Sequence, residues 1–218
     1  MMLELLFAAV LCGQAQAPAA PDVLSHRIEL AKAPEAFTRL NAELRKAGVL
    51  RADFSEEKRI VGMKIPLRSA GSLVFSGAHG LYRKATTPRE LELVVTRKGI
   101  EQRTASGVER FDLQKQPAAK VFVDAFLLVF SGDEAGLARE FELYFDGTFE
   151  SWTLGLAPRR EPLSKAIAHI VVRGERGVLR EIVVTEKQGG VTTTLWSNVV
   201  LAQPLTAEEE RRWFGARE

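Results

Sequence analysis

The most constraining feature of the sequence is a ten-residue run, 121–130, in which Asp124 is the only residue that is not apolar. As an α-helix the run would be about 15 Å long, roughly half the thickness of a bilayer core, so it cannot span a membrane. It is also apolar on every face, whereas a helix on a protein surface keeps one polar face. We therefore expect it to contact apolar groups on several sides, either as a buried core helix or as a lid over an apolar cavity.

The first seventeen residues have the pattern of a cleavable signal peptide. A short apolar core spans 5–11, and Ala15-Gln16-Ala17 provides the small-x-small pattern of a cleavage site. The segment before the core contains Glu4 and no lysine or arginine, which departs from the usual basic start. The alternative is a buried N-terminal helix. We predict a signal peptide over 1–17 that is cleaved near Ala17, export to the periplasm, and a single domain formed by residues 18–218.

Charge and chemically reactive residues exclude several classes of function. The 30 basic and 28 acidic residues are spread along the chain without the dense basic patch that a nucleic-acid partner requires. Cys12 is the only cysteine, so cleavage would leave none for thiol or disulfide chemistry. His26, His79 and His169 form no metal-binding pair such as H-x-x-x-H, and no G-x-S-x-G motif occurs. We expect no enzyme activity, no cofactor and no metal, and we interpret His79 as a solvated turn residue.

Outside the apolar run, most of the chain alternates between apolar and polar residues, as β-strands with one buried face do. We count about nine to eleven such segments, one of them at 61–67, with short turns such as 174–177 between them. A sheet of this kind is antiparallel and tends to curl. Amphipathic helices are predicted at 34–46 and, from the capping-box pattern Thr206-x-x-Glu209, near the C-terminus. The predicted class is mainly β with helices (α+β): a curled antiparallel sheet with helices at its open side.

The order of several short motifs resembles one known family. In chain order they are Phe54-Ser55-Glu56-Glu57-Lys58 after the first helix, Ser69-x-Gly71-x-Leu73-x-Phe75, Leu81-Tyr82 with Pro88, Ser131-Gly132-Asp133 after the apolar helix, and Trp152-Thr153-Leu154-Gly155-Leu156-Ala157-Pro158. This succession extends over nearly the whole chain after residue 17. It resembles the periplasmic outer-membrane lipoprotein carrier family, the LolA-like proteins.

The resemblance implies an unclosed β-barrel that is covered by a helical lid and encloses a hydrophobic cavity. It also implies a monomeric carrier without covalent chemistry, which takes a lipidated protein from an inner-membrane ABC transporter and passes it to an outer-membrane receptor. The chain departs from the family at 76–80, where the best-known members carry an Arg-Pro whose arginine contacts the lid. The cargo therefore stays open between a lipoprotein and a glycolipid or other lipid. A periplasmic sensor or interaction domain that recognises lipidated partners is a further alternative.

The predicted binding site combines the apolar side of the strands with the apolar helix. A lipid chain of about sixteen carbons gains about 13 kcal/mol on burial, so a carrier needs an extensive apolar lining. The candidate lining is Leu50, Phe54, Leu73, Phe75, Leu91, Leu93, Val95, Trp152, Leu154 and Leu156, and the candidate lid is Phe122, Phe126, Leu127 and Phe130. The alternative is that these residues fill an ordinary core. We expect Asp124 to point to solvent; an ion pair that ties the lid to a basic residue is the other possibility.

Overall fold

The computed structural model describes residues 22–115, 117–202 and 204–215; the predicted signal peptide lies outside them. Within these residues, twelve antiparallel strands form one sheet in the order β1-β8-β9-β10-β11-β12-β2-β3-β4-β5-β6-β7. Because β1 and β7 lie at the two ends of this order, the sheet does not close into a barrel. The strands are β1 (Arg27–Ile28), β2 (Val49–Arg59), β3 (Leu67–Ser76), β4 (Gly80–Thr87), β5 (Leu91–Val95), β6 (Gly99–Thr104), β7 (Gly107–Asp112), β8 (Phe141–Gly147), β9 (Trp152–Pro158), β10 (Ile167–Glu175), β11 (Val178–Glu186) and β12 (Val191–Ala202).

The predicted curled antiparallel sheet with helices is confirmed, with one strand more than the top of the predicted range. Strand β1 has only two residues, which is too short for an alternating pattern to reveal. The prediction of a strand at 61–67 was wrong, because 60–66 form the loop between β2 and β3. Gly62 has a φ of +86°, and Pro66 lacks an N–H for a β ladder, so this backbone turns. The predicted turn at 174–177 is confirmed between β10 and β11.

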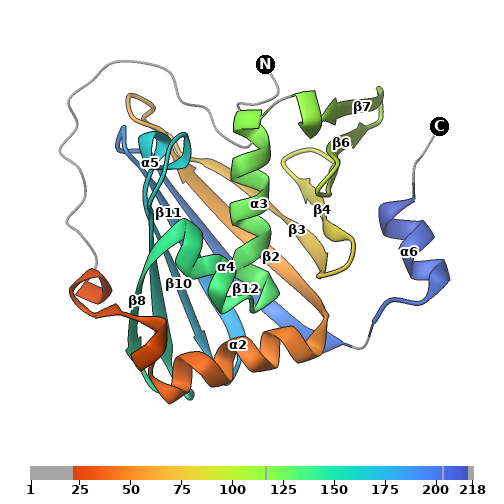
Figure 1. Cartoon of the computed structure of the whole chain (residues 1–218). Helices are drawn as coiled ribbons and strands as arrows, with labels where there is room; N and C mark the ends of the chain where they lie inside the picture. The colour runs from red at the N-terminus through yellow and green to blue at the C-terminus, as the bar shows by residue number, and fades with distance from the viewer. Residues whose placement is uncertain (1–21, 116, 203, 216–218) are drawn as a thin grey trace.

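Three helices lie on the concave side of the sheet: α2 (Glu35–Ala47), α3 (Pro117–Ser131) and α4 (Glu134–Glu140) (Figure 1). The predicted apolar helix is α3, and it runs across the open side of the curled sheet (Figure 1). The remaining helices are η1 (Asp22–Ser25), η2 (Leu30–Lys32), η3 (Leu113–Lys115), α5 (Leu163–Ala166) and α6 (Ala207–Phe214). Among the helices described, none combines the length and apolar character needed to cross a membrane.

The C-terminal end of α3 is packed against α2. Gly132 follows α3 with a φ of +68°, and a Cβ there would lie only 2.3 Å from the carbonyl oxygen of Asn41 in α2. Arg45 of α2 also donates a hydrogen bond of 2.7 Å from Nη2 to the carbonyl oxygen of Gly132. The helix α2 itself docks through an apolar stripe at helical spacing, formed by Phe37, Leu40 and Leu44. This end of α3 is therefore held in place by a close helix–helix contact.

The C-terminal helix α6 packs on the convex side of the sheet. The predicted capping box is confirmed, since Thr206 accepts from the Glu209 N–H and the Glu209 side chain accepts from the Thr206 N–H. Arg51 of β2 pairs with Glu209 at 2.6 Å and lies over the Trp213 ring. A second hydrophobic cluster lies beneath the helix: Val49, Val74, Tyr82 and Val94, with Ala202, Leu205, Trp213 and Phe214 packed against them. The two sides of the sheet thus carry separate apolar clusters.

Candidate functional site

The concave face is apolar because successive side chains of a strand point to opposite faces, and the large hydrophobic residues occupy the positions that point inward. On β2, Leu50 and Phe54 point to this side and are buried. Antiparallel pairing places Phe75 of β3 opposite Leu50, and Trp196 of β12 opposite Phe54. Residues directly opposite each other on one face are in contact range, so neighbouring strands build a continuous apolar surface.

The structure brings the described members of the predicted site together in one hydrophobic cluster. The buried members are Leu50, Phe54, Leu73, Phe75, Val95, Trp152, Leu154 and Leu156 of the predicted lining and Leu127 and Phe130 of the predicted lid. Leu91 and Leu93 of β5 are half-buried and pack against the same cluster. The side chains of Phe122 and Phe126 lie outside the described residues. That this surface binds lipid remains a prediction.

Phe130 anchors the C-terminal end of α3 to the concave face. Its ring stacks on Trp196 of β12, with centroids 5.2 Å apart and planes 10° apart. It also contacts Phe75 of β3, at a centroid distance of 5.3 Å. Both partners belong to central strands, so α3 is fixed at this end to the middle of the sheet.

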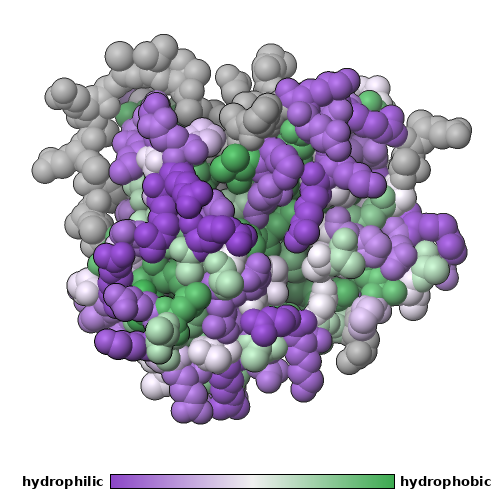
Figure 2. Space-filling model, viewed as in Figure 1, coloured by the Kyte–Doolittle hydropathy of each residue, from purple (hydrophilic) through white to green (hydrophobic). Residues whose placement is uncertain are grey.

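A hollow lies beside α3 on the concave side. Figure 2 shows hydrophobic residues at the bottom of this hollow, between α3 and the strands β3 and β4, with hydrophilic residues around its rim. Leu93 of β5 and Val121 of α3 are half-buried apolar side chains that pack against the main cluster. An apolar floor with a polar rim can accept a hydrocarbon chain while its polar end stays near the opening.

Asp124 makes its ion pair within α3. Its partner is Lys120, one helical turn earlier, and both side chains are about two-fifths exposed. The expected orientation toward solvent agrees with this exposure. The contact stabilises the helix locally and does not tie α3 to the sheet.

A band of polar side chains crosses the concave face next to the apolar surface. The carboxylate of Glu56 on β2 accepts hydrogen bonds from Arg83 Nη2 at 3.0 Å and from Thr194 Oγ1 at 3.1 Å. Arg83 Nη2 also donates a hydrogen bond of 3.1 Å to Ser69 Oγ of β3. The Arg83 guanidinium lies 4.0 Å from the centre of the Phe54 ring. The Glu56 side chain is only 27% exposed, so this carboxylate belongs to the concave face and not to a solvated surface. Glu56 lies an even number of residues from Leu50 and Phe54 on β2, so its side chain points to the same, concave side of the sheet.

A second ion pair continues this band toward the end of the sheet where β2 meets the β2–β3 loop. Lys58 Nζ of β2 lies 3.4 Å from Glu186 Oε1 of β11, and each side chain is only 12% exposed. The concave face therefore has an apolar part under the anchored end of α3 and a polar part farther along β2. Among the described residues, no group of three or more His, Cys, Asp or Glu side chains could hold a metal ion.

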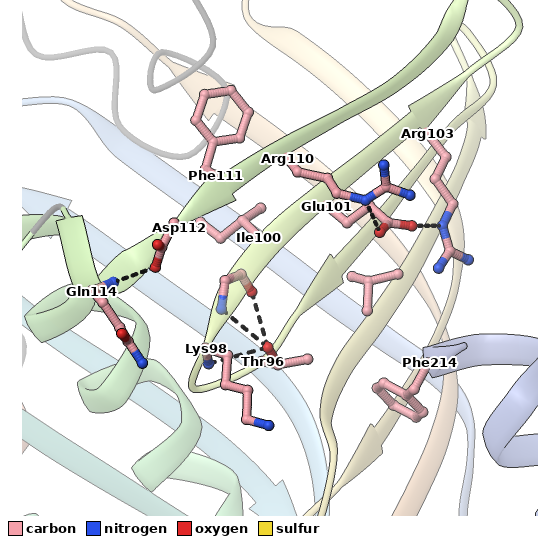
Figure 3. A pocket seen from close by; sticks show the side chains of 12 residues that line it. Thr96, Lys98, Ile100, Glu101, Arg103, Arg110, Phe111, Asp112, Gln114 and Phe214 are labelled. Atoms are coloured by element: carbon pink, nitrogen blue, oxygen red, sulfur yellow. Dashed lines mark hydrogen bonds and ion pairs between the residues drawn. The ribbon is translucent and has the colours of Figure 1, made fainter. Parts of the chain in front are cut away.

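A pocket of about 430 Å³ lies between α6 and the strands β6 and β7, with Phe214 of α6 among its lining residues (Figure 3). Its polar wall is a ladder across β6 and β7, in which Glu101 accepts hydrogen bonds from Arg103 at 2.5 Å and Arg110 at 2.9 Å. Burial alone would raise the pKa of Glu101, but these two hydrogen bonds outweigh it and the pKa is lowered. Arg103 also donates to the Gly215 carbonyl oxygen at 2.7 Å. These charged groups therefore bind one another and the end of α6.

His79 lies in the predicted turn, but the interpretation of its side chain as solvated was wrong. Its ring stacks on Phe214 of α6 at a centroid distance of 5.4 Å, and Nε2 lies 3.0 Å from Glu210 Oε1. The sequence places His79 more than a hundred residues from α6, so local patterns carried no sign of this contact. The segment 76–80 thus supports α6 on the convex side.

One family model matches residues 31–210, most of the chain, and it describes an outer membrane lipoprotein carrier protein, LolA-like. This chain belongs to that LolA-like family. The resemblance drawn from motif order is thereby confirmed. No curated protein matches the chain significantly.

Solved structures similar to this LolA-like chain have low sequence identity. A LolA superfamily protein from Nitrosomonas europaea is 10% identical, with a TM-score of 0.42, and the match covers 80% of this chain and 95% of that one. The lipoprotein LppX from Mycobacterium tuberculosis is 8% identical, with a TM-score of 0.45 and coverage of 80% and 99%. A chain of the Pseudomonas aeruginosa MucA/MucB complex is 12% identical, with a TM-score of 0.46 and coverage of 79% and 59%.

Proposed function

We propose that this LolA-like protein is a periplasmic lipoprotein carrier that holds acyl chains between α3 and the concave face of its sheet. In this proposal residues 18–218 act as one lipid-carrier domain after cleavage of the leader near Ala17. The protein takes a lipidated protein from an inner-membrane ABC transporter and passes it to an outer-membrane receptor. It acts as a monomer and performs no covalent chemistry.

The observation that carries the proposal is the family match over residues 31–210. The geometry supports it in two ways. The inward-facing residues of neighbouring strands form one apolar surface, and α3 lies over that surface, held at its C-terminal end by the ring contacts of Phe130. Since each buried CH₂ contributes about 0.8 kcal/mol, an acyl chain placed along this surface recovers most of what it loses on leaving a membrane.

The proposal is tested by measuring acyl-chain binding to the purified protein with a fluorescent fatty-acid analogue. Leu93 is half-buried on the concave side, so Leu93→Glu puts a charge against the proposed chain while sparing the fully buried core. We expect its affinity for the probe to fall at least about ten-fold, because a carboxylate resists burial beside hydrocarbon. The matched control is Leu195→Glu, since Leu195 is half exposed on β12. A wild-type protein that binds no acyl probe would refute the proposal.

A second candidate cargo is a glycolipid or another lipid with a hydrogen-bonding head group. The polar band favours it, because Glu56, Arg83, Ser69 and Thr194 place donors and acceptors on the concave face beside the apolar surface. One acid and one base leave the core of this band without net charge. Such a band suits a neutral or zwitterionic head group better than a strongly anionic one.

Mass spectrometry of lipid extracted from the purified protein separates the candidates. Acylated protein supports the lipoprotein carrier, and a free polar lipid supports the second candidate. In the second case Arg83→Met should weaken binding of the polar lipid and leave the fatty-acid probe unaffected. A protein that binds lipidated partners without removing them from a membrane would instead indicate a sensor or interaction domain.

A further inference from the structure

The loop between β2 and β3 exposes an unusual concentration of apolar side chains. Met63 is 51% exposed, Ile65 is 77% exposed, and Leu67, the first residue of β3, is 48% exposed. Six large hydrophobic residues are exposed in the described part of the chain, and these three lie within five positions. Scattered exposed hydrophobic residues are ordinary, but a cluster at the tip of a hairpin indicates an interaction surface. We call residues 60–67 the hairpin tip.

Basic residues surround the hairpin tip. Arg59 and Arg68 flank it with side chains that are each 74% exposed, and Lys64 lies within it and is exposed. Glu57 is hydrogen-bonded to both arginines, at 2.8 Å and 3.0 Å, and these bonds lower its pKa. Three cations against this one carboxylate leave a net charge of +2. The surroundings of the hairpin tip are therefore complementary to an anionic surface.

The hairpin tip also has a defined place in the fold. It protrudes at the end of the molecule where α3 begins, opposite the end that Phe130 anchors (Figure 1). A Cβ on Gly62 would have no heavy atom within 4 Å, so the tip is open on that side. The strands that carry the tip, β2 and β3, also carry the concave apolar surface.

We propose that the hairpin tip is a membrane-docking element, which inserts Met63, Ile65 and Leu67 among the lipids of an anionic bilayer surface while Arg59, Lys64 and Arg68 contact head groups. Apolar insertion combined with basic contacts is the way in which peripheral segments bind anionic bilayers. The docking lies outside the concave face and does not depend on the proposed cargo. It would bring the open end of that face next to a membrane.

Vesicle flotation of the full chain tests this proposal, with vesicles of phosphatidylcholine alone and vesicles that also contain phosphatidylglycerol. We expect the wild type to prefer the anionic vesicles, and Met63→Ser with Ile65→Ser to bind them at least about ten-fold more weakly. Lys64→Gln should cost about five-fold on anionic vesicles only, since one charge is removed. The matched control is Leu195→Ser with Val200→Ser, which removes two exposed hydrophobic residues of β12 and should bind like the wild type.

The outcomes separate docking from cargo binding. Leu93→Glu should float like the wild type if docking uses the hairpin tip, even if it no longer binds an acyl probe. Failure of the wild type to float, or equal flotation of the tip variant, would overturn the membrane proposal. Concentration-dependent dimers that disappear in the tip variant, without vesicle binding, would assign the tip to self-association and overturn it as well.

Discussion

Replacing Phe130 by alanine should release the anchored end of α3. The ring is 2% exposed and lies between Trp196 at 5.2 Å and Phe75 at 5.3 Å. Truncating a buried phenylalanine costs about 3–5 kcal/mol, which includes the loss of such aromatic pairs. In a domain of this size each kcal/mol lowers Tm by about 2–4 °C, so we expect a decrease of about 6–20 °C.

Urea unfolding measures this loss, and hydrogen exchange of the 121–131 amides locates it. The control is Phe149→Ala, because Phe149 is a half-buried phenylalanine whose ring lies 3.9 Å from the Arg39 guanidinium and outside the core cluster. We expect that control to lose about 1 kcal/mol. If Phe130→Ala loses no more stability than Phe149→Ala, or if exchange in α3 is unchanged, the inferred anchoring is incorrect.

Three further predictions concern stability. Lys58→Met or Glu186→Gln alone should each lower the free energy of unfolding by about 3 kcal/mol, because one buried charge loses its partner. The double replacement should lower it by less than the sum of the two, and a double-mutant cycle measures the difference. Gly132→Ala should lower the free energy of unfolding by well over about 1 kcal/mol, because the backbone strain at positive φ adds to a steric clash with α2. Gly62→Ala is the control: Gly62 also has a positive φ, but a Cβ there would meet no atom, so only the backbone strain should appear. Burial, with a smaller effect from a nearby lysine, lowers the pKa of His169. The stability that the neutral, buried imidazole contributes is therefore present above about pH 6.5 and is lost as the pH falls toward the lowered pKa. In His169→Gln the free energy of unfolding, measured with urea, should change less between pH 7 and pH 5 than in the wild type.

Local patterns were sufficient for the elements that build the concave face. The apolar run at 121–130 predicted α3, and alternation in segments such as 49–59 predicted strands, because side-chain periodicity follows directly from backbone geometry. The same parity correctly grouped the described candidate lining residues on one side of the sheet. It failed at 61–67, where alternation continues through a loop whose direction is set by Gly62 and Pro66.

Contacts between distant segments could not be derived in this way. Glu56 and Arg83 meet because β2, β3 and β4 pair in one particular register, and a register places each inward side chain beside partners that are remote in the sequence. The contact of His79 with α6 likewise joins segments more than a hundred residues apart. Strand and helix types followed from spacing along the chain, as did their apolar faces. The polar band, the anchored end of α3 and the exposed hairpin tip depended on long-range packing, because burial and pairing are properties of the assembled sheet.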